Sequence, residues 1–205
     1  SQLSLFRSSG PLAFEPPENH SVSSYPSAIA AADLDRDGFV DLLVVEQGRL
    51  SVLVGDGRGG LEDPIRISVD FVARGGAVAD VDEDGVADLV IPSSGGLVWL
   101  LRGRGDGTFL APAPVYDMHP DPPVPPYFDS TRSPTAIAVG DFDGDGHLDF
   151  ALSDDNVGWV DVALGSGDGT FRVGSRNDIG APSLHVAAID WDRDGVLDLA
   201  LARED

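Results

Sequence analysis

A nine-residue pattern, D-x-D-x-D-G-x-x-D, occurs four times in this chain of 205 residues. Its copies begin at Asp33, Asp80, Asp141 and Asp190, and each carries carboxylates at positions 1, 3, 5 and 9 and glycine at position 6. Hard cations such as Ca²⁺ take several oxygen ligands, and glycine permits the sharp turn of such a loop. The pattern therefore predicts four calcium loops, and the rest of the chain must fold so as to present them.

The expected ligands in each loop are the four aspartate side chains and the backbone carbonyl of the residue at position 7. Mg²⁺ fits less well, because it prefers a tight octahedron that keeps several waters. The expected ligands are Asp33, Asp35, Asp37, Phe39 and Asp41; Asp80, Asp82, Asp84, Val86 and Asp88; Asp141, Asp143, Asp145, His147 and Asp149; and Asp190, Asp192, Asp194, Val196 and Asp198.

An EF-hand is excluded by the residue at position 12 of each loop. An EF-hand needs a bidentate Glu there, whereas the four copies have Val44, Ile91, Leu152 and Leu201. The flanks are short apolar runs typical of strands, such as "TAIAVGD" before the third loop and "DFALSD" at its end. Each loop is therefore expected to join two β-strands.

The acidity of the chain is concentrated in these loops, whose pattern aspartates alone are 16 of its 35 acidic residues. The net charge of −22 speaks against nucleic-acid binding, since no basic stripe could neutralise phosphates. There is no cysteine, which excludes disulfides and thiolate chemistry, and no apolar run is long enough to insert into a membrane. Residues 1–20 lack the order of a signal peptide. If the protein is extracellular or at the cell surface, as its calcium loops lead us to expect, this sequence is its mature form.

The repeat extends beyond the loop and predicts a four-stranded antiparallel unit. A third strand follows each exit strand, then a glycine-rich turn, "GDGTF" at 105–109 and 167–171, and a fourth strand. Such a unit cannot bury both faces alone, so copies pack face to face, as in a β-propeller. We expect an all-β propeller of four four-stranded blades in a single domain, with blades at about 27–70, 73–116 and 134–178 and a closing blade from 183–205 plus 1–20.

The loops and the "GDGTF" turns resemble the FG-GAP or VCBS repeats, which build the calcium-binding propeller of integrin α subunits and many bacterial surface proteins. The resemblance covers nearly the whole chain and implies the same calcium ligands on the 16 aspartates. The turn of the first copy, "GRGGL" at 57–61, departs from the motif. Family members usually have seven blades, more than this length provides, so the resemblance does not supply the number of blades.

The spacing of the repeat predicts how the two ends of the sequence relate. The first Asp of a loop and the apolar residue closing the later turn are 28 to 30 residues apart, and joining Asp205 to Ser1 gives 29 between Asp190 and Phe14. We therefore expect strands at about 2–7 and 197–203 to pair in one blade. Closure within one chain is favoured by the zero-residue join. An eight-bladed ring of two chains, head-to-tail strand exchange and a fragment of a larger propeller remain open.

One spacing is longer than the others, which marks an insertion at 117–133 rich in proline. Loops absorb extra length cheaply, so a tolerated surface loop and a contact surface are both possible interpretations. Aromatic residues in or near it are candidate contacts with a partner or a glycan: Trp99, Tyr116, Tyr127 and Phe128.

No nucleophile with a base, histidine cluster or unexplained carboxylate pair is found, so we do not expect an enzyme. The favoured function is a non-catalytic module for adhesion or assembly, with a protein or copies of itself as partner, whose hairpins are rigidified by Ca²⁺. Loops of this kind would fill at extracellular calcium concentrations. The alternatives are a glycan-binding propeller and the subunit of a surface filament built by strand exchange.

Overall fold

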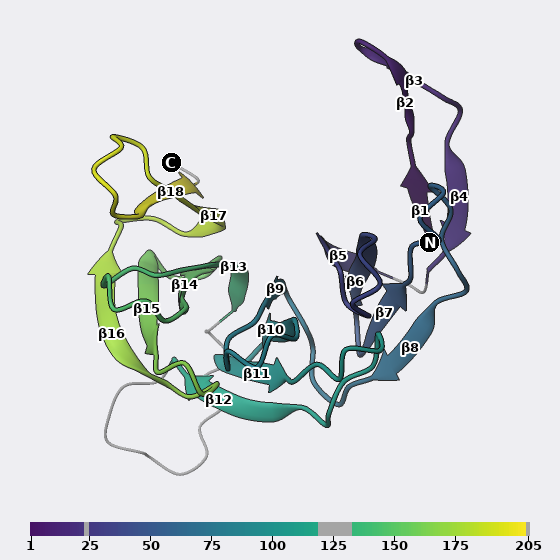
Figure 1. Ribbon diagram of the computed structural model, residues 1–205. Helices are drawn as coiled ribbons and strands as arrows, with labels where there is room; N and C mark the ends of the chain where they lie inside the picture. The colour runs from purple at the N-terminus through teal and green to yellow at the C-terminus, as the bar shows by residue number, and fades with distance from the viewer. Residues whose placement is uncertain (23–24, 119–132, 204–205) are drawn as a thin grey trace.

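The computed structural model describes residues 1–22, 25–118 and 133–203. All regular secondary structure in these ranges is β-strand, as the sequence predicts. The sheets follow one another along an open arc, with the N-terminal strands at one end and the C-terminal strands at the other (Figure 1). Within the described part of the chain there is no helix with the length and hydrophobicity needed to span a lipid bilayer.

Three sheets are complete four-stranded antiparallel units, called blades 1, 2 and 3 here. Their strands pair in chain order, so each blade is a meander. Blade 1 holds β5 (Pro26–Ala32), β6 (Asp41–Glu46), β7 (Arg49–Leu53) and β8 (Ile65–Ser68); blade 2 holds β9 (Ala77–Ala79), β10 (Asp88–Pro92), β11 (Leu97–Leu101) and β12 (Ala113–Asp117); blade 3 holds β13 (Pro134–Gly140), β14 (Asp149–Asp154), β15 (Trp159–Gly165) and β16 (Phe171–Asp178).

Each end of the arc carries half of such a unit. The N-terminal half-blade is the pair β1 (Gln2–Leu5) and β4 (Glu18–Ser21), extended by the hairpin of β2 (Ser8–Gly10) and β3 (Ala13–Phe14). The C-terminal half-blade is the pair β17 (Ser183–Ile189) and β18 (Asp198–Arg203). These are the two parts that the sequence assigns to one closing blade.

The expected pairing of 2–7 with 197–203 within one chain is not formed. In the described residues β1 pairs only with β4, and β18 pairs only with β17. The physical reason is that each half-blade packs on the complete blade beside it, which holds the two halves at opposite ends of the arc (Figure 1). The fold is therefore propeller-like, but the ring is open.

The core lies between blades, because the middle strands of each blade are buried on both faces. Leu43 and Leu50 of blade 1 pack with Leu89 and Ile91 of blade 2, and all four are fully buried. Blades 2 and 3 share a second cluster, in which the rings of Tyr116 and Phe150 meet edge to face. Face-to-face packing of this kind explains why β6, β10 and β14 are buried along almost their whole length, whereas exposure alternates along the outer strand β8.

Candidate metal centre

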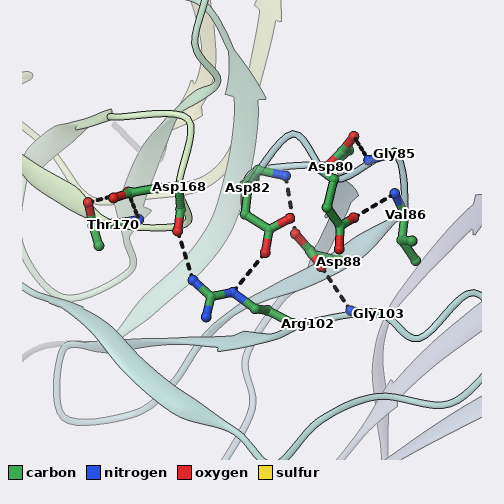
Figure 2. Close-up of polar contacts among 11 residues, drawn as sticks. Asp80, Asp82, Gly85, Val86, Asp88, Arg102, Gly103, Asp168 and Thr170 are labelled. Carbon is green, nitrogen blue, oxygen red and sulfur yellow. Dashed lines mark hydrogen bonds and ion pairs between the residues drawn. The ribbon is translucent and has the colours of Figure 1, made fainter.

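Every metal loop occupies the same place, the connection between the first and second strands of a blade. The loop of blade 2 shows how its backbone holds the carboxylates (Figure 2). Asp80 accepts hydrogen bonds from the amides of Asp84 and Gly85, at 3.1 and 2.9 Å. Asp84 accepts one from the amide of Val86, at 2.8 Å. Because these amides fix the side chains before any ion arrives, the carboxylates are pre-organised.

Two residues of each loop have left-handed backbone conformation. Position 6 is the glycine that the sequence predicts, with φ between 83° and 92°. Position 4 is also left-handed, with φ of 66° at Arg36, 58° at Glu83 and 65° at Arg193, and glycine in the third copy. Non-glycine residues rarely adopt this conformation, so the residue types at position 4 do not predict it. The two reversals wrap the loop around the point on which its carboxylates converge.

The carboxylate at position 9 is fixed from both sides. In blade 2, Asp88 accepts hydrogen bonds from the amides of Val81 in the loop and Gly103 beyond the third strand, at 3.2 and 2.8 Å. Asp41 and Asp149 accept the equivalent pairs of bonds, and all three carboxylates are at most 1% exposed. The third strand therefore contributes to the geometry of every complete site.

Oxygen atoms from at least three carboxylates per loop lie within 4.8 Å of one another. The donor set, carboxylate oxygen alone, suits a hard cation such as Ca²⁺. Blade 2 gives an independent sign of fit, since Asp82 Oδ1 is buried without a hydrogen-bond partner and a cation would satisfy it. The converging groups are Asp33, Asp35 and Asp37; Asp80, Asp82 and Asp88; Asp141, Asp143 and Asp149; and Asp190, Asp192 and Asp194.

Electrostatics within the loops penalise the metal-free charged state. Burial raises the pKa of Asp88 to about 6, and the neighbouring charge of Asp82 adds to the effect. Burial likewise raises the pKa of Asp149, and that of Asp35, where Asp41, Asp37 and Asp33 also contribute. Carboxylates that resist ionisation beside one another are stabilised by a divalent cation, which removes their mutual repulsion.

The residues at position 7 are held through their own amides. The N–H groups of Phe39, Val86, His147 and Val196 each donate to the aspartate at position 5, at 2.8 to 2.9 Å. Their carbonyls as ligands stay a prediction from the sequence.

Arginine and histidine side chains beside the loops were missed by sequence reasoning. The Nε of Arg102 lies 2.8 Å from Asp82 Oδ2, and its Nη2 donates to the carbonyl of Asp168 in blade 3, at 2.7 Å (Figure 2). His147 Nδ1 lies 2.6 Å from Glu83 Oε1, which joins the loops of blades 3 and 2 and raises the pKa of the imidazole. Neither pairing follows from the repeat, because these positions vary between copies.

The glycine-rich turns connect each loop to the next blade. The amide of Gly107 in blade 2 donates to the carbonyl of Leu34 in the loop of blade 1, at 3.2 Å, and that of Gly169 in blade 3 donates to Val81 in blade 2, at 3.2 Å. The glycine-rich turn of blade 2 therefore lies against the metal loop of blade 1, and that of blade 3 lies against the metal loop of blade 2. A change in one loop can be transmitted to the neighbouring blade through this contact.

The aromatic residues expected to contact a partner or a glycan, so far as the structure describes them, pack within the blades. The ring of Trp99 stacks on Phe71 at 4.7 Å and 4°, and its indole N–H donates to Ser93 Oγ. Tyr116 is 8% exposed. Both rings are thus largely engaged within the fold, which leaves little surface for a ligand. Tyr127 and Phe128, with most of the expected insertion, lie outside the described residues.

Carboxylate loops joined to four-stranded antiparallel sheets define a repeat protein of the propeller type. The chain belongs to the FG-GAP repeat family: the FG-GAP-like repeat matches at 33–91, 80–152 and 141–201, which confirms the expected resemblance. No curated protein gave a significant match.

Solved structures with the same fold include propeller-like proteins at low sequence identity. A lectin from Agrocybe aegerita that recognises non-reducing terminal N-acetylglucosamine has a TM-score of 0.61 at 20% identity, over 96% of this chain and 54% of its own. BBS1N in complex with ARL6DN has 0.61 at 12%, over 89% and 52%. The K499G mutant of the NanB sialidase from Streptococcus pneumoniae has 0.65 at 12%, over 100% and 33%. The chain thus spans about half or less of the proteins it resembles.

Proposed function

We propose that this protein is a non-catalytic, calcium-binding propeller module that acts outside the cell in adhesion or protein assembly. The observation that carries the proposal is the convergence of carboxylates in four loops at equivalent places of the repeat, with one buried oxygen, Asp82 Oδ1, lacking a partner. When bound, Ca²⁺ would neutralise the carboxylates and lock the hairpins. The chain's own part is to hold the aspartates by backbone amides.

The ligand chemistry, rather than any targeting signal, supports the proposed extracellular location. Ca²⁺ sites in extracellular modules have Kd values on the order of 10⁻⁴ to 10⁻³ M, which suits concentrations outside cells. A non-catalytic role is supported by the contacts of the loop carboxylates. In the described residues they accept hydrogen bonds from amides of their own loops or neighbouring strands, except Asp82, which pairs with Arg102.

The number of blades belongs to the same proposal. We propose four blade equivalents, blades 1 to 3 and a fourth that combines the C-terminal half-blade with the N-terminal half-blade. Each would carry one Ca²⁺.

Calorimetric titration of the purified chain with CaCl₂ tests the metal binding. We expect four sites with Kd values in the range above, and D141A should remove one site and leave three. Absence of binding, or binding of Mg²⁺ with equal affinity, would overturn the calcium assignment. Kd values below about 10⁻⁶ M would contradict an extracellular module, because such sites also fill inside cells.

A glycan-binding function is the second candidate, favoured by the structural similarity to a lectin and by one aromatic side chain. Trp159 is 36% exposed, and the guanidinium of Arg176 lies 5.6 Å from the centre of its ring. The cavity near Arg176 has a volume of only about 70 Å³, smaller than typical ligand pockets. A sugar would therefore have to stack on the exposed ring. A glycan array with the calcium-loaded protein and a W159A control would detect it.

A further inference from the structure

The two half-blades are complementary parts of one blade. Residue pairs of β1 and β4 match those of β7 and β8 at a constant offset of 47, so that Leu3↔His20 corresponds to Leu50↔Ile67. Pairs of β17 and β18 match those of β5 and β6 at an offset of 157, and the irregularity near Ser183 recurs in β5 at the same point. The N-terminal half-blade thus repeats the last two strands of blade 1, β7 and β8, and the C-terminal half-blade repeats the first two, β5 and β6.

The missing contact between the halves has a defined register. In blade 1 the two halves join through β6 and β7, with Val44↔Ser51 and Leu42↔Leu53 as opposite residues. Applying the two offsets predicts that β18 pairs with β1, with Leu201 opposite Ser4 and Leu199 opposite Phe6. Both strand edges lack a partner among the residues described.

The fourth metal loop is incomplete without the N-terminal half-blade. In blades 1 to 3 the carboxylate at position 9 accepts a bond from the amide of Gly55, Gly103 or Gly165, beyond the third strand. Asp198 accepts the hydrogen bond from the loop amide of Trp191, at 3.0 Å. Asp198 is however exposed, whereas Asp41, Asp88 and Asp149 are buried. The residue equivalent to Gly55 is Ser8, whose amide would supply the second bond.

Charge and apolar surface agree with the same pairing. Arg7 occupies the position of Arg102, and Asp192 that of Asp82, so the joined blade would place Arg7 beside Asp192 as Arg102 lies beside Asp82. Phe6 is 55% exposed, whereas its equivalents Leu53 and Leu101 are fully buried.

Trp191 is a second apolar residue that is exposed where its equivalents are buried. It is 79% exposed, although Leu34 and Val81 at the same loop position are 2% exposed. In blades 1 and 2 the carbonyl of this residue accepts a bond from a turn glycine of the next blade. For Trp191 the corresponding turn is the one around Gly59, in the blade that carries the N-terminal half-blade.

The occupant that fits these edges is a second copy of this chain. Each half-blade is packed on its own neighbouring blade, through Leu3 with Val44 and Leu53 at one end and Val186 and Leu199 with Ala151 at the other. The two halves of one chain therefore stand apart (Figure 1), whereas a two-fold arrangement joins the halves of two chains twice.

We propose that two copies of this chain close a ring by pairing β18 of each with β1 of the other, so that the fourth metal site is built from both chains. The proposal rests on the proposed function, with its four metal loops. The pairing of 2–7 with 197–203 that the sequence predicts would then form between two chains instead of within one. Ser8 and Arg7 of one copy would complete the loop around Asp190 and Asp198 of the other.

Disulfide trapping tests the pairing directly, because the chain contains no cysteine. Opposite residues of antiparallel strands have Cα atoms roughly 4.5 to 5.5 Å apart, within disulfide reach. A chain carrying S4C is mixed with a chain carrying L201C and oxidised in CaCl₂. We expect a covalent dimer from the mixture that neither single variant gives in this yield. The pair S4C and A200C is the register control, since its side chains point to opposite faces.

The same chemistry separates the alternatives. If the double variant S4C/L201C forms an intrachain disulfide in a monomer, and the mixture forms none, the ring closes within one chain and the proposal is wrong. Light scattering of the unmodified protein should give twice 21.4 kDa, and larger assemblies would overturn the two-copy ring. The calcium assignment is tested separately by the calorimetric titration. A cross-link in the mixture together with no calcium binding in that titration would reject the calcium assignment alone.

Discussion

At the scale of single residues, Arg102 makes the metal site of blade 2 different from those of blades 1 and 3. Its guanidinium neutralises Asp82, whereas the equivalent residues Val54 and Leu164 are apolar. We expect R102L to raise the affinity of this site for Ca²⁺ by roughly 3- to 10-fold, because it removes a competing positive charge. The same change should lower the stability of the metal-free protein by about 0.5 to 1 kcal/mol. Calorimetry and chelator melts measure both effects, and the apolar-to-apolar change V54L is the control.

The raised pKa of Asp88 predicts an unusual response to acid. With a folded pKa of about 6, above that of a free aspartate, the folded protein takes up a proton that the unfolded chain does not. In chelator, lowering the pH from about 7 to about 5 should therefore stabilise the wild type relative to D88N. In calcium the sign should reverse, because protons compete with the metal. Equal pH dependence of the two proteins in chelator would contradict this account.

At the scale of strands and loops, the sequence predicted the repeat but not every contact that holds its loops in place. Strand positions followed from short apolar runs, and the loop aspartates from the spacing around Gly38 and its equivalents. The left-handed residue at position 4, the bond from Gly103 to Asp88 and the pairing of Glu83 with His147 were not predictable. The last two depend on contacts between segments far apart in sequence, for which local patterns carry no signal, whereas the first is a local conformation that non-glycine residues rarely adopt.

The element-scale prediction concerns the packing of one blade on the next. Leu89 of β10 is fully buried in the cluster between blades 1 and 2, so L89A leaves a cavity and should cost about 2 to 5 kcal/mol. L184A in β17, where the side chain is 43% exposed, should cost less than about 1 kcal/mol. Denaturant unfolding in CaCl₂ compares the two. Similar losses would mean that the blades do not stabilise one another as the structure indicates.

At the scale of the whole molecule, metal binding and assembly should be linked through the fourth site alone. The net charge of −22 opposes the compact state of the metal-free chain, and each bound Ca²⁺ would reduce this repulsion. All four sites therefore contribute to stability, but only the site around Asp192 would also contain residues of a second copy. We expect D192N to weaken dimerisation. D143N, the same change at the matching position of blade 3, should lower the melting temperature and leave dimerisation unchanged.

Sedimentation of both variants over a range of protein concentrations in CaCl₂ measures the dimer constant, and thermal melts at the same concentrations measure stability. For a ring of two copies the melting temperature of the wild type should rise with protein concentration, because association stabilises the folded state by mass action. If D143N and D192N weaken the dimer equally, the metal acts through overall charge. A melting temperature independent of concentration would show instead that each chain folds without the other.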